Sequence, residues 1–294
     1  MESYTQLSKR IHPLKKRSLR KEFLSFKRKH HSTADRYLAS SAVFWFLIAF
    51  IGQLIFVLYI FGLYGVSLYQ GDFERWNAMM PNGYTEGDIA GNINIGIHLF
   101  LAAVISLGGP LQIIPSLRKW FPTFHRWNGR IYIFTAIIIS LTGFYLTWIR
   151  GSIGGLIGDI AITINGILII TFAIVAIRHA MARKFAIHRK WALRLFMVVS
   201  GVWFFRIGFM FWMLIHQEPV GFDPDTFQGP FLTFLSFAQY LLPLLFLELY
   251  FWAKERAGQA GKVVTAVLIA VLAIATAVGI FGATMGLWLP PLTS

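Results

Sequence analysis

Seven long apolar stretches divide this chain, and each is long enough to cross a lipid bilayer. A transmembrane α-helix needs about 20 consecutive residues that are mostly apolar. The sequence therefore predicts an all-α, polytopic integral membrane protein with seven transmembrane helices, in which spans two to five (91–215) form a four-helix core. The predicted spans are 38–64, 91–114, 130–149, 158–178, 192–215, 231–252 and 263–288.

The basic residues predict the orientation of these helices. Of the 27 Lys and Arg residues, 24 lie in the N-terminal tail, in every second loop or at the adjoining span ends. Only Arg75 and Arg150 lie in the opposite loops, and Arg206 lies inside a span. Because cytoplasmic loops retain Lys and Arg, we expect a cytoplasmic N-terminus and an external C-terminus.

Composition excludes several classes of function. A net charge of +14 is compatible with nucleic-acid binding, but the basic residues follow membrane sidedness and form no single face, so no nucleic-acid partner is expected. The chain contains no cysteine, which excludes disulfides and thiolate metal sites. No metal site and no catalytic residue is predicted, and whether the protein is an enzyme stays open.

The domain organisation follows from the same pattern. Residues 1–37 form a basic tail, residues 38–288 form the membrane domain, and residues 289–294 form a short external C-terminus. The tail is either disordered or an amphipathic helix on the anionic lipids of the inner leaflet, since apolar residues recur among its basic ones. It is also a candidate docking site for a partner protein.

One group of candidate site residues lies at the inner ends of spans three and five. Arg guanidinium groups fit phosphate or carboxylate, and helix N-termini favour anions, so this group predicts a pocket for a small anion or a lipid headgroup. The alternative is that these residues set topology and contact bulk anionic lipid without specificity. The candidate ligands of the anion are Arg126, Arg130, His188, Arg189 and Arg194.

Glu248 is the only acid well inside a predicted span. An unpaired carboxylate there is costly, so it is expected to pair with Arg194 or Arg130. Glu248 either forms a structural ion pair that fixes span six to the core, or acts as a counter-ion at the ligand site.

A second polar group lies in the outer half of the membrane. His98 and Arg206 are expected at a similar depth, with Tyr145, Asn165 and Gln239 on the same side of the midplane. An intramembrane Arg usually faces the bundle interior or water. These residues form either a buried network that orients helices or an outer ligand-binding site containing His98 and Arg206.

Haem b is the possible cofactor. A bis-histidine haem needs two imidazoles at equal depth on facing helices, and His125 with His188 form the best pair. The helix count resembles the layout of b-type cytochromes related to cytochrome b561, in architecture only, because the usual embedded histidine pairs are missing.

The stretch from His98 to Arg206 resembles a family of bacterial predicted membrane proteins known only as a domain of unknown function. The resemblance includes the Gly109-Pro110-Leu111-Gln112 run and the two segments around His125-Arg126 and His188-Arg189. It implies a location in the bacterial inner membrane and makes these polar positions the ones to test. It implies no established activity.

These observations leave three functions. The leading interpretation is binding or transport of a small anionic or amphipathic ligand, such as a lipid headgroup, a phosphate or a carboxylate. The alternatives are a haem-containing electron-transfer protein and a structural or assembly subunit of a membrane complex.

Overall fold

The computed structural model describes residues 32–80 and 82–293, and these form helices joined by loops, with one isolated β-bridge between Asp223 and Gln228. The basic tail lies almost wholly outside the described residues. The long helices are α2 (Thr33–Ile60), α4 (Ile89–Ile113), α6 (Pro122–Tyr145), α7 (Gly155–Met181), α8 (Phe185–Val199), α9 (Gly201–His216), α10 (Pro230–Arg256) and α11 (Gln259–Ala283). The short ones are α3 (Val66–Gln70), α5 (Pro115–Trp120), α12 (Pro290–Thr293), a 3₁₀ helix η2 (Glu74–Ala78) and three π-helical turns, η1 (Phe61–Gly65), η3 (Leu146–Arg150) and η4 (Thr284–Trp288).

Six helices are long and apolar enough to cross a membrane, and a seventh span is formed if α8 and α9 are counted together. This confirms the all-α polytopic fold. The first span begins at Thr33, a few residues before the predicted start, because Ser32 caps the helix. The Ser32 side chain accepts a bond from the backbone N–H of Asp35, and the Asp35 carboxylate accepts one from the backbone N–H of Ser32.

The predicted span 192–215 is formed by parts of two helices, α8 and α9. The helix axis bends by 52° between α8 and α9. The bend occurs at Ser200 and Gly201, and a Ser–Gly pair is a common cause of a sharp kink. The Ser200 hydroxyl accepts a hydrogen bond from Nε2 of Gln53, at 2.9 Å, which fixes the bend against α2.

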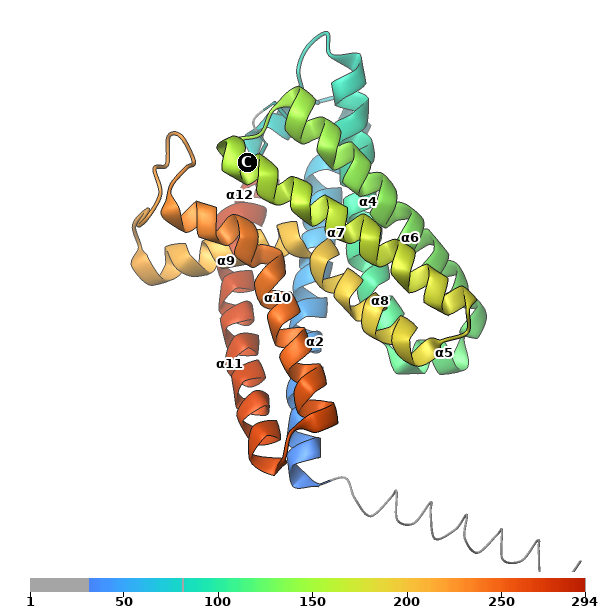
Figure 1. Ribbon diagram of the computed structural model, residues 1–294. Helices are drawn as coiled ribbons and strands as arrows, with labels where there is room; N and C mark the ends of the chain where they lie inside the picture. The colour runs from blue at the N-terminus through green and yellow to red at the C-terminus, as the bar shows by residue number, and fades with distance from the viewer. Residues whose placement is uncertain (1–31, 81, 294) are drawn as a thin grey trace, which may run out of the picture.

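The bend divides the protein into two groups of helices. Helices α4, α6, α7 and α8 lie side by side as a four-helix bundle, while α9 leaves that bundle and packs against α10 and α11 (Figure 1). Helices α2 and α11 pack along each other. Their buried cluster includes the small residues Ala49 and Ala283, which let helix backbones approach closely in a membrane.

The two ends of the protein differ in their connections. One end, here called the loop end, carries the loop 71–88, the turn 151–154 and the loop 217–229, whereas the opposite end, the basic end, carries α5 and the turns 182–184 and 257–258 (Figure 1). At the basic end, Nζ of Lys262 lies 2.7 Å from the Asp35 carboxylate and joins the starts of α2 and α11.

Candidate functional site

A cavity of about 690 Å³, the central cavity, lies between the four-helix bundle and the helices around it. Its wall contains residues of α2, α4, α6, α7, α9 and α10, and most of that wall is aliphatic or aromatic. Small-molecule sites in proteins have this size and this mixture of apolar wall and few polar groups. The polar side chains that line it include Gln53, Tyr59, Tyr64, His98, Ser140, Arg150, Asn165, Ser200, Arg206 and Gln239.

Four of the residues that the sequence placed in the outer half of the membrane line this cavity together. They come from four different helices: His98 from α4, Asn165 from α7, Arg206 from α9 and Gln239 from α10. Tyr145, which was expected beside them, does not belong to the wall. The structure therefore brings the predicted outer group to one site, and ligand binding by that group stays a prediction.

Arg206 is a charged group of the cavity wall and lies in the interior of α9. Its Nη1 is 3.5 Å from the carbonyl oxygen of Val202, and its guanidinium carbon lies 5.4 Å from the ring centroid of Phe56. Within residues 32–80 and 82–293, no Asp or Glu forms an ion pair with it. The positive charge is thus held against an aromatic face in a largely apolar cavity, without a protein carboxylate.

His98 presents one ring nitrogen to the protein. Its Nδ1 lies 2.9 Å from the hydroxyl of Thr142, and that hydroxyl donates its single hydrogen to the carbonyl of Ile138 or Ile139. The contact with Thr142 joins α4 to α6 at the cavity wall.

Three amide side chains of the wall have an oxygen with no hydrogen-bond donor among the described residues: Gln53, Asn165 and Gln239. In Gln239 the amide nitrogen donates to the carbonyl of Ser236, at 2.7 Å, which assigns the free atom as the oxygen. Buried polar atoms in proteins usually have a partner. These acceptors therefore favour a wet cavity or a ligand with N–H or O–H groups.

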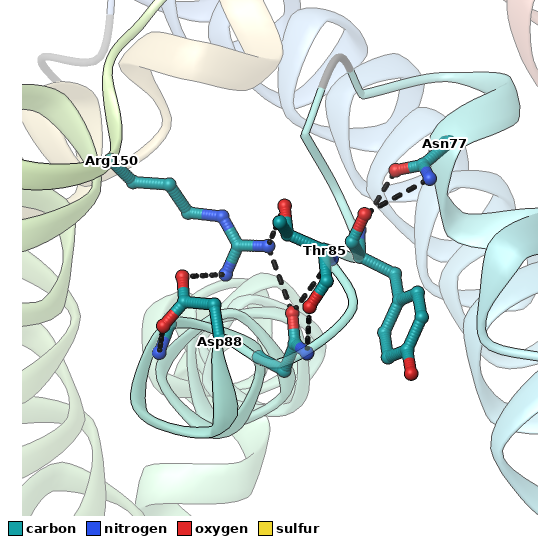
Figure 2. Close-up of polar contacts among 7 residues, drawn as sticks. Asn77, Thr85, Asp88 and Arg150 are labelled. Carbon is teal, nitrogen blue, oxygen red and sulfur yellow. Dashed lines mark hydrogen bonds and ion pairs between the residues drawn. The ribbon is translucent and has the colours of Figure 1, made fainter.

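Arg150 lines the cavity at the loop end, and Figure 2 shows the polar contacts of its side chain. Its Nη2 donates to the Thr85 hydroxyl at 3.1 Å and to Oδ1 of Asn92 at 2.9 Å, and its Nη1 lies 3.6 Å from the carboxylate of Asp88. Only 6% of the Arg150 side chain is exposed. One buried guanidinium therefore fastens the loop 71–88 and the start of α4 to the end of η3.

The loop is also folded by its own side chains. The Asn77 amide exchanges two hydrogen bonds with the backbone of Tyr84, at 2.8 and 3.0 Å, and Asn92 does the same with Thr85 (Figure 2). Because Met79, Met80 and Asn82 of this loop line the cavity, these bonds hold one part of its wall in place.

Three helices change to a π-helical turn near the loop end, and all three turns contribute to the wall: Tyr64 from η1, Thr147 from η3 and Leu287 from η4. A π-helical turn inserts an extra residue into a helix and occurs frequently at functional sites. The hydroxyl groups of Tyr59 and Tyr64 lie 3.1 Å apart across η1. Neither the π-helical turns nor this tyrosine pair was predicted.

The predicted anion pocket at the basic end has a different arrangement. Nε and Nη2 of Arg194 donate to the two carboxylate oxygens of Glu248, at 2.6 and 2.9 Å. Arg194 is thus the partner of Glu248, as was expected for one of two candidate arginines. The guanidinium of Arg194 is therefore already bound to a carboxylate of the protein. Arg126, Arg130 and Arg189 are exposed, and none of these four arginines lines the central cavity.

The two histidines considered for haem also lie outside the central cavity. Nδ1 of His188 donates to the carbonyl oxygen of Ala176, at 2.9 Å. Nδ1 of His125 is buried and has no partner among the described residues. A bis-histidine haem needs two imidazoles on opposite sides of one space. Among the described residues, His98 is the single histidine that lines the central cavity, and this wall does not fit that cofactor.

Part of the chain is similar to a known family of proteins. The family described as "Predicted membrane protein (DUF2306)" matches residues 95–241. The chain belongs to this family. No curated protein and no solved structure matches the chain.

The DUF2306 region runs from α4 into α10 and confirms the family resemblance predicted from the sequence. It contains four polar residues of the cavity already described, His98, Asn165, Arg206 and Gln239, and also Arg150. The cavity wall nevertheless includes α2, which lies outside the match. The family region alone therefore does not complete the site in this protein.

Sequence reasoning missed two kinds of cavity residue. Gln53 is a single amide in a long apolar run, and Arg150 was taken only as an exception to the charge pattern. An isolated polar residue within a predicted span is a usable signal, because such residues seldom face lipid. For Arg150 the signal is weaker, since an Arg at a helix end has many other uses.

Proposed function

We propose that this protein binds a small amphipathic molecule in the central cavity, with the anionic group of that molecule at Arg206. The observation that carries the proposal is the guanidinium of Arg206, which lines the cavity and forms no ion pair with the described residues. With the orientation expected from the basic residues, the cavity would lie in the outer half of a bacterial inner membrane.

The need for an anion follows from electrostatics. A charged side chain at the centre of a membrane helix costs about 2.5–3.5 kcal/mol on insertion scales. The ring of Phe56 recovers a part of this cost, because an aromatic face attracts a cation. A ligand phosphate or carboxylate would recover more, because Arg presents paired N–H donors to such groups.

The need for an apolar portion follows from the rest of the wall. Residues such as Ile60, Leu99, Ile162 and Phe209 line the cavity beside its polar groups, and they favour hydrocarbon over water. A ligand with one charged end and one apolar end would satisfy both parts of the wall. Inorganic phosphate alone would leave the apolar part without a partner.

The cavity supports this function better than the basic end does. Arg194 is paired there with Glu248, and Arg130 lies beside Trp127, with 5.1 Å between the guanidinium carbon and the ring centroid. An exposed Arg of that kind is screened by water and salt and binds anionic lipid without selectivity. Arg206, in contrast, lines the central cavity with its guanidinium beside the ring of Phe56.

The test uses octyl phosphate with the full-length protein in detergent, and uncharged octanol as the comparison ligand. Binding is followed by thermal unfolding and by tryptophan fluorescence, since Trp203 lies in the cavity wall. We expect Arg206→Gln to weaken octyl phosphate binding at least about tenfold, because a charge-assisted bond contributes about 1.5–3 kcal/mol. Arg206→Lys should recover a part of the affinity.

The matched control is Arg189→Gln, which removes an exposed Arg from α8, away from the cavity. It should leave the affinity unchanged. Equal binding of octyl phosphate to the wild type and to Arg206→Gln would refute the proposal. A larger loss with Arg189→Gln than with Arg206→Gln would move the site to the basic end.

A further inference from the structure

A second cavity, of about 400 Å³, adjoins the central one between α7, α10 and the loop 217–229, and we call it the side cavity. Its wall and that of the central cavity share five residues, so the two spaces adjoin each other. The shared residues, which form the junction, are Gly154, Gly158, Phe205, Phe227 and Ser236.

The outer rim of the side cavity is apolar and exposed. Leu156 and Ile157, in the first turn of α7, belong to its wall and are 65% and 51% exposed. Both α7 and α10 are helices long and apolar enough to span a membrane. These two side chains make the rim of the side cavity apolar at the end of α7 that adjoins the turn 151–154.

The junction itself has room for a chain. A Cβ atom added to Gly158 would meet no heavy atom within 4 Å, although Gly158 is buried and belongs to both walls. Opposite it, the rings of Phe205 and Phe227 lie with their centroids 6.5 Å apart. The junction is thus bounded by a bare helix backbone and by two aromatic rings, which is a surface that suits a hydrocarbon chain.

The junction leads to the charged group. Phe205 belongs to both cavity walls and Arg206 lines the central cavity, so a chain at the junction can extend into the space that contains the guanidinium. At the loop end, Met79, Met80 and Asn82 of the loop 71–88 belong to the cavity wall, and Arg150 bonds to this loop.

We propose that the ligand is a membrane lipid with an anionic headgroup, which reaches Arg206 laterally from the bilayer through the opening between α7 and α10. Its acyl chain occupies the junction and the side cavity. This inference rests on the proposed function. It narrows the small amphipathic ligand to a lipid that enters the cavity from the membrane.

The test maps where a lipid chain lies. Full-length protein is reconstituted in nanodiscs that contain phosphatidic acid with a photoreactive diazirine in one acyl chain. After illumination and digestion, we expect the label on the peptides that contain Leu156 to Gly158 and Leu232 to Thr233. Excess dioleoyl phosphatidic acid should compete with the label, whereas inorganic phosphate should not. Label confined to the outer faces of α2 or α11 would overturn the proposal.

A variant pair tests the opening itself. Gly158→Trp places an indole in the open space at the junction, and labelling should fall at least about fivefold because a filled pocket excludes the chain. Ile167→Trp puts the same side chain on α7 at a position that is 53% exposed and lies outside both cavity walls, and it should label like the wild type. Undiminished labelling of folded Gly158→Trp would refute lateral access.

The failures of the two proposals are distinguishable. If octyl phosphate still depends on Arg206 while the lipid labels neither rim peptide, lateral access is wrong and anion binding stands. Both proposals are wrong if the wild type and Arg206→Gln show the same labelling of the rim peptides and also bind octyl phosphate with the same affinity. If Gly158→Trp does not fold, the label map of the wild type decides the question alone.

Discussion

Replacing Arg206 by methionine should stabilise the protein without ligand, although it removes the proposed binding group. The embedded guanidinium costs about 2.5–3.5 kcal/mol on insertion scales. The contact with Phe56 returns about 0.5–2 kcal/mol, and the contact with the Val202 carbonyl, at 3.5 Å, is too long to add much. Met fills irregular apolar space, so Arg206→Met should gain about 1 kcal/mol, or a rise in Tm of about 2–4 °C.

The assay is thermal unfolding of the detergent-solubilised protein, with and without octyl phosphate. The wild type should have the lower Tm without ligand and should gain stability as octyl phosphate is added, because a ligand that binds only the folded state stabilises it. Arg206→Met should start higher and gain nothing. If Arg206→Met unfolds several degrees below the wild type without ligand, Arg206 has a structural partner and the reasoning is refuted.

The substitution Arg194→Met should have the opposite effect on stability and lower the Tm. Arg194→Met removes two bonds to Glu248 and leaves that carboxylate without its partner. The Glu248 side chain is 47% exposed, so the loss is reduced by solvent and should be about 1–2 kcal/mol. A Tm of Arg194→Met at or above that of the wild type would show that this ion pair does not hold α10 to α8.

Three further predictions concern the rest of the fold. Arg150→Ala should increase hydrogen exchange across the loop 71–88 at least about tenfold, because the loop loses about 1.5–3 kcal/mol of charged hydrogen bonding; unchanged exchange would contradict the role of Arg150. Gly279→Val should lower the free energy of unfolding by about 1–3 kcal/mol, measured by thermal unfolding, since a Cβ there would lie 2.5 Å from the Ile207 carbonyl oxygen. In the cysteine-free chain, Ser152→Cys should react with an impermeant maleimide on intact cells, and Lys184→Cys only after permeabilisation; the reverse would refute the expected orientation.

Much of the fold could be predicted because a bilayer imposes a length on every span. The apolar runs located all the long helices, and the fixed rise of an α-helix placed His98 and Arg206 at a similar depth. Both residues line the central cavity in the structure. Glu248 was likewise expected to need a cation, because an embedded carboxylate is costly, and Arg194 was one of the two candidates.

The sequence by itself therefore determined that the chain forms long apolar helices and where along the chain their apolar parts lie. The tertiary structure alone decided the bend at Ser200, the use of Gln53 in the wall, the fastening of the loop by Arg150 and the opening beside Gly158. The physical reason is that a membrane helix meets apolar surroundings on every side. Because lipid and neighbouring helices favour the same side chains, the apolar pattern fixes a helix in depth but does not specify which of its faces meets the cavity.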